Sequence, residues 1–249
     1  MKTILISNRK GGSGKSTTAV NLAVEFSKKH STLLIDFDTQ GHASIGVGLS
    51  SVEENGSHSI FLNSTLSATF RPTICENLTL SPALEFFDVY EYSDISGILK
   101  NRFKKEKIND FFEYCIIDTA PTYDSLLKNA LEVSDIVIIP VVPHYLGIVG
   151  VEQMFRAIYQ MSLSVGKKPP KVFILPVMYN PHINEHKESL KKLIENFGED
   201  KLFSPIGTDI HLATQFEYKT PSVLSNKRSK GSNDYKKFAQ ELLDKLKGS

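Results

Sequence analysis

The sequence predicts an α/β protein with a mostly parallel central sheet and helices packed on both faces. Short apolar runs typical of buried strands alternate with helical patterns along the whole chain. The first apolar run is followed by a glycine-rich loop and a helical pattern, and two later runs end in aspartate. No internal repeat or second domain boundary interrupts this alternation. We therefore expect one domain over residues 1–249, long enough to bury a substantial core.

Composition and charge exclude several classes of protein. The 29 Lys and Arg residues against 28 Asp and Glu give a net charge of +1, so nucleic-acid or membrane binding must come from a local patch. Cys75 and Cys115 are too few for a disulfide framework, and they lack metal-ligand spacing. No apolar run approaches the ~20 residues that span a bilayer, and Met1 leads straight into a strand without a signal peptide. We therefore expect a cytoplasmic protein.

A phosphate-binding loop is predicted between the apolar run 4–6 and the helical pattern that begins at Ala19. Three glycines let backbone N–H groups converge on an anion, and the following helix adds the positive end of its dipole. Lys15 would reach the outer phosphates of a nucleotide, and the hydroxyl of Ser16 would bind magnesium. Arg9 stands where the plain Walker pattern has its first glycine. The residues expected to contact the nucleotide here are Lys10, Gly11, Gly12, Ser13, Gly14, Lys15, Ser16 and Thr17.

Two acidic segments follow buried strands and would lie near this loop. The run 32–36 ends at Asp36 and continues to Asp38, and the run 114–118 ends at Asp118. Carboxyl ends of parallel strands meet at one edge of a sheet, where ligands bind. An apolar strand that ends in aspartate is the Walker B arrangement, in which the carboxylate of Asp118 helps to hold magnesium. The segment that begins at Asp36 is also compatible with an ordinary polar turn.

The other elements follow from periodicity and from proline and glycine signals. We predict helices at 17–29, 94–107, 123–133, 147–165 and 184–197, strands at 77–82, 135–142 and 171–177, and, within 203–249, a short strand, an Asp209-led helix, a basic loop and a final helix. Residues 41–76 show poor periodicity and receive no assignment. The apolar stripe of the final helix favours docking on the core over membrane binding, and comprises Tyr235, Phe238, Ala239, Leu242, Leu243 and Leu246.

The loop spelling Lys-Gly-Gly-x-Gly-Lys-Ser/Thr resembles the deviant Walker A motif of the ParA/MinD superfamily of ATPases. Further matches are an Asp-x-Asp-x-Gln-Gly segment at 36–41, an Asp-x-x-Pro segment at 118–121, and a segment at 235–242 similar to Tyr-x-x-Leu-Ala-x-Glu-Leu. The resemblance extends from Ile4 to Leu243. It is closest to the small ParA/Soj branch, which lacks an N-terminal helix-turn-helix domain, and such a domain is not expected here either.

The resemblance implies a weak ATPase that uses ATP and Mg²⁺ and forms a homodimer when ATP binds. By this match, Lys10 contacts the phosphates of the partner's nucleotide, and Asp38 polarises or positions the attacking water. Asp36 supports the magnesium shell, and Met178 contacts the adenine. The implied catalytic residues are Lys10, Lys15 and Asp38, and the implied metal-binding residues are Ser16, Asp36, Asp38 and Asp118.

Members of the ParA/Soj branch bind nonspecific DNA as ATP dimers, and a ParB-like or other cargo-adaptor protein stimulates their ATPase. The resemblance therefore implies segregation of plasmid or chromosomal DNA, or positioning of another cargo, in the cytoplasm or on the nucleoid. One departure concerns DNA, because Thr208 and His211 occupy positions where the family commonly has arginine. Basic residues that could replace these arginines, or form an ordinary exposed loop, are Lys219, Lys227, Arg228 and Lys230.

Three other classes of function compete with this interpretation. A MinD-like division-site or cargo regulator would bind membranes through the final helix. An ATPase with a metal cluster, similar to the nitrogenase iron protein, needs cysteines just after the strands, but Cys115 precedes Asp118 and no cysteine follows. A purely structural protein with a dead site is disfavoured by Lys10, Lys15 and the acidic residues together. The sequence identifies neither the cargo nor the partner.

Overall fold

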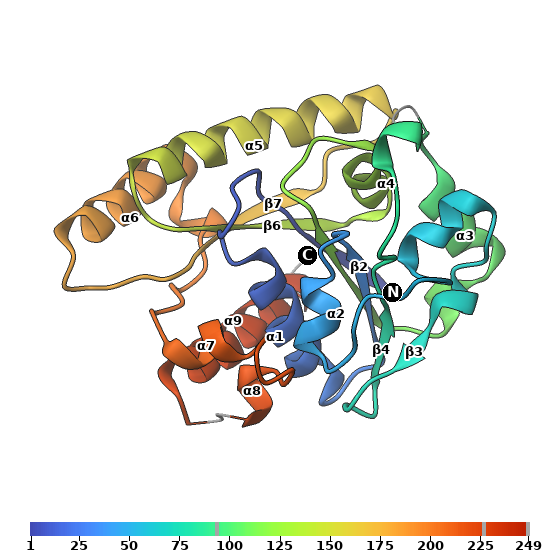
Figure 1. The fold of residues 1–249 in the computed structure, drawn as a ribbon. Coiled ribbons are helices and arrows are strands. Elements are labelled where there is room, and N and C mark those ends of the chain that lie inside the picture. The colour runs from blue at the N-terminus through green and yellow to red at the C-terminus, as the bar shows by residue number, and fades with distance from the viewer. Residues whose placement is uncertain (93–94, 226–227, 248–249) are drawn as a thin grey trace.

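One sheet organises the molecule, which we describe from a computed structural model over residues 1–92, 95–225 and 228–247. Within these ranges, seven strands lie in the order β3-β4-β2-β5-β1-β6-β7 (Figure 1). Neighbouring strands pair in parallel, except that β3 runs antiparallel to β4. The predicted mostly parallel sheet is confirmed. The strands are β1 (Lys2–Ile6), β2 (Thr32–Phe37), β3 (Arg71–Pro72), β4 (Leu78–Ser81), β5 (Tyr114–Thr119), β6 (Ile136–Val141) and β7 (Lys171–Pro176).

Helices cover both faces of this sheet, as the sequence predicts. In Figure 1, α5 and α6 lie along one side of the sheet, and α1 and α9 lie along the other. The helices are α1 (Lys15–Ser27), α2 (His42–Gly46), α3 (Ile98–Lys105), α4 (Ser125–Val133), α5 (Tyr145–Ser164), α6 (Asn184–Phe197), α7 (Ile210–Thr214), α8 (Ser222–Ser225) and α9 (Lys230–Lys247).

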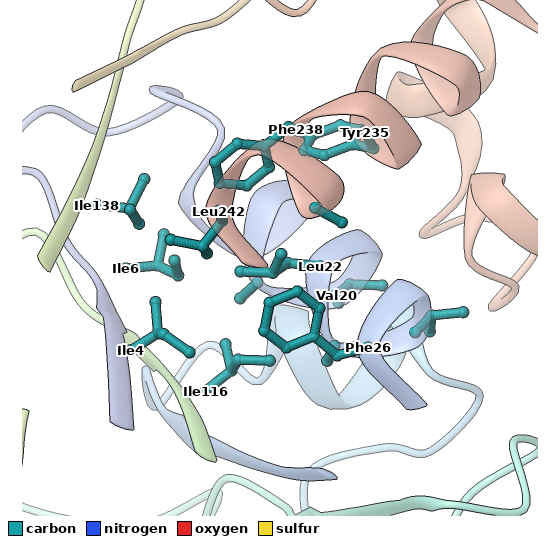
Figure 2. Packing of buried hydrophobic residues seen from close by; sticks show 14 of the residues in the cluster. Ile4, Ile6, Val20, Leu22, Phe26, Ile116, Ile138, Tyr235, Phe238 and Leu242 are labelled. Carbon is teal, nitrogen blue, oxygen red and sulfur yellow. The ribbon is translucent and has the colours of Figure 1, made fainter. Parts of the chain in front are cut away.

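Each face of the sheet carries its own hydrophobic cluster. Ile4 and Ile6 of β1 belong to a cluster with α1 and α9, whereas Leu5 between them belongs to a cluster with α4 and α5. This alternation follows from the pleat, which points successive side chains of a strand to opposite faces. Figure 2 shows the first cluster, in which Phe26 of α1 and Phe238 of α9 lie against the strands. The two layers of helices fix the sheet whose edge carries the site described below.

The final helix α9 is part of the core. Tyr235, Phe238 and Leu242 are buried, and the Tyr235 hydroxyl lies 3.0 Å from the Thr18 hydroxyl of α1 in a buried hydrogen bond. The prediction that its apolar stripe docks on the core is therefore confirmed. No helix in the described part of the chain combines the length and the apolar character that crossing a bilayer requires.

The segment after α6 differs from the predicted short strand. The segment lies along the edge of β7. One isolated bridge joins Leu202 to Ile174 of β7, and a second joins Gly207 to Tyr179, which follows β7. Pro205 lies between these bridges and has no N–H group to donate. This explains why a continuous ladder does not form here.

Other differences also have local causes. The helix predicted at 94–107 begins at Ile98, because Gly97 has a left-handed backbone (φ +79°) that a helix does not accommodate. Residues 41–76, for which the sequence predicts no element, form α2, two 3₁₀ turns and β3. Such short elements carry too little periodicity to be recognised from sequence.

Candidate active site

The glycine loop between β1 and α1 forms an open backbone cradle. Gly12 (φ +69°) and Gly14 (φ +80°) adopt left-handed conformations that other residues rarely take. A Cβ atom added to Gly11 or Gly12 would meet no atom of the described residues within 4 Å. Gly14 directly precedes α1 and has no side chain to cap it, which leaves the first N–H groups of the helix available to an anion.

Two adjoining cavities lie beside this loop. The larger has a volume of about 400 Å³ and is lined by residues 11–17 together with Asp38, Gln40, His42, Pro121 and Phe216. The smaller, about 200 Å³, is lined largely by apolar residues, among them Val177 and Met178. The cavities adjoin because Gly14, Thr17 and Phe216 line both. The loop backbone and Lys15 at the first cavity suit phosphate groups, and the apolar lining of the second suits a planar base.

Met178 lines the second cavity, and the family resemblance implies that it contacts the adenine. Its side chain is 44% exposed, and its backbone has φ +54°, a conformation that non-glycine residues seldom adopt. The Thr208 hydroxyl donates to the Met178 carbonyl oxygen at 3.2 Å. This bond joins the turn after β7 to the segment that leads into α7.

Lys15 begins α1 and is almost buried, with 7% of its surface exposed. Burial lowers the pKa of the Lys15 ammonium, and the nearby charges of Asp118 and Asp38 oppose this effect. An ammonium group on a residue that lines the larger cavity is complementary to the negative charge of phosphates. The loop and Lys15 therefore form one anion-binding arrangement.

Asp118 lies at the carboxyl end of β5, fully buried, and is the register partner of both Ile6 and Asp36. Within the described ranges, neither of its carboxylate oxygens has a hydrogen-bond partner. Burial raises the pKa of Asp118 well above its ordinary value, and the charge of Asp36 adds to the effect, which the neighbouring Ser16 partly counteracts. A buried carboxylate without donors is costly unless something binds it. Its chemistry fits a hard divalent cation such as magnesium.

Asp36, at the end of β2, has a different environment. One oxygen accepts hydrogen bonds from the backbone N–H (2.8 Å) and hydroxyl (2.7 Å) of Ser44 in α2, and the other accepts from the backbone N–H of Asp38 (3.2 Å). Burial raises the pKa of Asp36 to about 7, although the hydrogen bonds from Ser44 oppose the shift. These bonds tie the carboxylate to the segment that carries Asp38. The Asp36 carboxylate therefore positions the segment that carries Asp38, and it does not line the larger cavity.

Asp38 and Ser16 both border the larger cavity. Asp38 is nearly buried, and its carboxylate accepts a hydrogen bond from the backbone N–H of Gln40 at 3.0 Å. In the part of the chain that the structure describes, no group of three or more His, Cys, Asp or Glu side chains is arranged to hold a metal ion. Magnesium commonly binds through one or two carboxylates, with phosphates and water completing its shell. Ser16 and Asp118 fit that pattern.

Lys10 points toward the start of α5 in its own subunit. Its backbone N–H donates to the Asn8 side-chain oxygen at 3.1 Å, and its Nζ lies 2.8 Å from Nε2 of His144. The sequence analysis missed His144. The helix predicted at 147–165 begins at Tyr145 instead, which makes His144 its N-cap, a position that the predicted start at Gly147 did not indicate.

The described basic residues that the sequence offers for DNA lie between the end of α7 and the start of α9. Lys219 is exposed with φ +49°, Arg228 lies in the turn before α9, and Lys230 begins that helix and lies 3.9 Å from Asp234. Lys227 lies outside the described residues. Thr208 and His211, which stand where the family commonly has arginine, lie just before α7 and within it. The backbone N–H of His211 donates to the Asp209 side chain.

Comparisons with known proteins identify relatives of this chain and structures that share its fold. An AAA domain family model matches residues 1–168 of the chain. The sporulation initiation inhibitor protein Soj of Bacillus subtilis is 27% identical over 248 residues, which cover 97% of this chain and 98% of Soj. The chromosome partitioning protein ParA of Myxococcus xanthus is 28% identical over 256 residues, which cover 97% of this chain and 88% of that protein.

Solved structures share the fold. Apo McdA of Cyanothece matches with a TM-score of 0.83 at 20% identity, covering 98% of this chain and 99% of McdA. A putative plasmid partition protein from Borrelia burgdorferi, bound to AMPPNP, matches with a TM-score of 0.81 at 24% identity. The match covers 98% of this chain and 99% of that protein. The family model covers two thirds of the chain and the curated relatives cover nearly all of it. From its glycine loop to its final helix, the chain belongs to the ParA/Soj family of P-loop ATPases.

Proposed function

We propose that this protein is a partition or positioning ATPase that dimerises on ATP, hydrolyses it slowly, and uses the cycle to segregate DNA or position another cargo. The observation that carries the proposal is the grouping of the glycine loop, buried Lys15, Asp38 and the unpartnered carboxylate of Asp118 at one edge of the sheet. This combination has an anion site, a cation site and a carboxylate beside them. Phosphoryl transfer to water requires all three.

ATP would lie across both cavities. Its phosphates would occupy the cradle of residues 10–17, and its adenine would enter the smaller cavity beside Met178. Phe216 lines both cavities and would lie between base and phosphates. The nucleotide-bound structure of the Borrelia burgdorferi protein, which contains AMPPNP, supports the choice of ligand.

Magnesium would be held by the Ser16 hydroxyl and the Asp118 carboxylate, and it would neutralise charge on the phosphates. Asp36 contributes indirectly, because its oxygens are already bonded to Ser44 and Asp38. Cobyrinic acid a,c-diamide synthase from Mycobacterium smegmatis has the same fold, with a TM-score of 0.81 at 24% identity over 99% of this chain and 96% of that protein. One of its structures contains ADP and magnesium. That structure supports magnesium as the metal.

Hydrolysis would use Asp38 to orient the attacking water. Asp38 lines the larger cavity together with Lys15, and its position is fixed through the bonds of Asp36. Lys15 and the loop N–H groups would stabilise negative charge that develops on the transferred phosphate. A single carboxylate without a dedicated base beside it fits slow turnover that a partner accelerates.

Dimerisation would bring Lys10 of one subunit to the nucleotide of the other. Lys10 is exposed and contacts His144. The next two residues, Tyr145 and Leu146, are large and apolar, and they are 67% and 66% exposed. Exposed apolar side chains beside a functional loop are typical of a surface that a partner covers. A second copy of the chain would cover this surface when ATP is bound.

DNA and a cargo adaptor are the remaining parts of the proposal. Lys219, Lys227, Arg228 and Lys230 would contact phosphates of nonspecific DNA in place of the family's arginines. The stimulating protein would be ParB-like or another adaptor, and the product of a neighbouring gene is the first candidate to assay.

The test combines light scattering with phosphate release. We expect ATP and its nonhydrolysable analogue, with Mg²⁺, to double the particle mass, whereas ADP leaves a monomer. Lys15→Ala is the control, because it should remove nucleotide binding and with it both effects. A protein that stays monomeric with every nucleotide and releases no phosphate would contradict the proposal.

A further inference from the structure

His144 makes two contacts at the point where β6 ends and α5 begins. Its Nε2 lies 2.8 Å from Nζ of Lys10, and its Nδ1 lies 3.0 Å from the backbone N–H of Gly147. The same Gly147 N–H also donates to the carbonyl oxygen of His144 at 2.9 Å. A Cβ on Gly147 would lie 2.3 Å from the carbonyl oxygen of Val142, so the start of α5 is held tightly against β6. The imidazole is therefore positioned by a rigid backbone.

The two contacts of His144 exclude each other chemically. A neutral imidazole carries one N–H group and one lone pair, and an ammonium group can only donate. Nε2 accepts from Lys10 only in the tautomer whose proton is on Nδ1, and that Nδ1 cannot accept from Gly147. In the other tautomer Nδ1 caps the helix and Nε2 faces Lys10 as a second donor. The Gly147 N–H has the His144 carbonyl as an alternative acceptor, so releasing the cap leaves no donor unsatisfied.

We propose that His144 holds Lys10 within its own subunit before dimerisation, and that the imidazole changes tautomer when the lysine leaves. This inference rests on the proposed function, in which Lys10 acts on the nucleotide of a second subunit. His144 is thus a positioning residue for Lys10. The ring is half-buried, so its proton can move between the nitrogens through water.

Protonation of His144 would release Lys10, because a ring with two N–H groups accepts from neither neighbour. The charged groups that face the imidazole are Lys10 from the glycine loop and Glu185 and His186 from α6. Burial and the charge of Lys10 lower the pKa of His144, and Glu185 opposes them. The neutral ring that can hold Lys10 therefore dominates at neutral pH.

The holding contact can be tested directly in the nucleotide-free protein. Long-range ¹H–¹⁵N spectra distinguish a ring nitrogen that carries a proton from one that does not. We expect Nε2 of His144 to lack a proton in the wild-type chain and to gain one in Lys10→Ala. An Nε2 that carries the proton in both proteins would overturn the inference.

Two substitutions separate the contacts. In His144→Asn the amide oxygen takes the place of Nδ1 and keeps the cap, but it does not reach Lys10. In His144→Gln the amide oxygen takes the place of Nε2 and can still accept from Lys10. With ATP, we expect the Asn variant to dimerise at about four- to hundredfold lower protein concentration than wild type, since one hydrogen bond in each of the two subunits no longer holds Lys10 back. The Gln variant should match wild type.

The outcomes distinguish this inference from the proposed function. Equal dimerisation by the Asn and Gln variants would overturn the role of His144. If no variant dimerises with ATP while the spectra still show a proton-free Nε2 that depends on Lys10, the holding contact stands and ATP-dependent dimerisation fails instead.

Discussion

Asp36 and Asp118 face each other in register on the neighbouring strands β2 and β5, yet their carboxylates have contrasting surroundings. Asp36 accepts three hydrogen bonds, two of them from Ser44, whereas Asp118 accepts none from the residues that the structure describes. The first carboxylate holds the segment that carries Asp38, and the second is left for a ligand. This division of roles gives the stability predictions that follow.

Asp118→Asn should stabilise the nucleotide-free protein at pH 8 by about 1 kcal/mol while abolishing stabilisation by ATP with Mg²⁺. The substitution removes a buried charge whose pKa is raised by burial and by the charge of Asp36, although the new amide N–H groups offset part of the gain. Thermal melting with and without ATP and Mg²⁺ measures both effects. Asp110→Asn, at an exposed position, is the control. A destabilised variant that still responds to ATP with Mg²⁺ would contradict the assignment.

The contribution of Asp36 to the stability of the nucleotide-free protein should fall as pH rises from about 4 to about 7, whereas the contribution of buried His58, whose pKa is lowered to about 4, should rise. The pKa of Asp36 is about 7 in the folded state against 3.8 ordinarily, so the folded state binds more protons across this range. Unfolding then releases protons, and the free energy of unfolding decreases with pH by up to about 1.4 kcal/mol per pH unit for one group. Urea unfolding at several pH values measures the slope. The slope of Asp36→Asn should be less negative than that of wild type, because only the contribution of Asp36 is removed and those of Asp118 and His58 remain. An unchanged slope in that variant would exclude a contribution from Asp36.

Ser44→Ala should lower the free energy of unfolding by about 1–3 kcal/mol. The Ser44 hydroxyl donates to the buried Asp36 carboxylate and accepts from the backbone N–H of Ala83, so its loss leaves both with an unmet bond. The matched control is Ser162→Ala, since the buried Ser162 hydroxyl has no partner among the described residues. Urea unfolding should show little cost in the control. If Ser44→Ala and Ser162→Ala lowered the free energy of unfolding equally, the hydrogen bonds of the Ser44 hydroxyl would make no specific contribution to stability.

Removing basic residues near α9 should weaken binding to nonspecific DNA and reduce its salt dependence. The combined variant Lys219→Ala, Arg228→Ala and Lys230→Ala loses up to three phosphate contacts, each of which contributes about one to the slope of log affinity against log salt. Filter binding with ATP at several salt concentrations measures that slope.

The control for DNA binding removes the same charge from α6, through Lys187→Ala, Lys191→Ala and Lys192→Ala. All three are exposed and lie away from the α7–α9 segment in the sequence. If both triple variants lose the same affinity, the effect reflects net charge rather than a site. A wild-type protein without salt-dependent binding would exclude DNA as the track.

Much of the fold could be predicted because each signal was local. The apolar run that ends at Asp118 and the helix that ends before Gly198 are visible in the residues themselves. The predicted strand after α6 was wrong because a single proline, Pro205, interrupts its ladder with β7 and leaves isolated bridges. Such an effect depends on which edge of the sheet the segment meets, and no local pattern contains that information.

The site was less predictable where contacts join distant segments. The spacing of Asp36 and Asp38 gave no indication that Ser44 would bind the first of them. His144 lies 134 residues from Lys10, so only the packing of β6 beside β1 brings the two together. Loop residues with a fixed spacing were therefore predictable, whereas their supporting partners were not.

The most direct measurement mixes two inactive variants, Lys10→Ala and Asp38→Ala. In a mixed dimer, the Lys10→Ala subunit keeps its own Lys15 and Asp38 and receives the missing lysine from its partner. One complete site is then restored, so phosphate release should appear in the mixture although neither variant hydrolyses ATP alone. A mixture that stays inactive while light scattering shows mixed dimers, or normal turnover by Lys10→Ala alone, would contradict a role for Lys10 across the subunit interface.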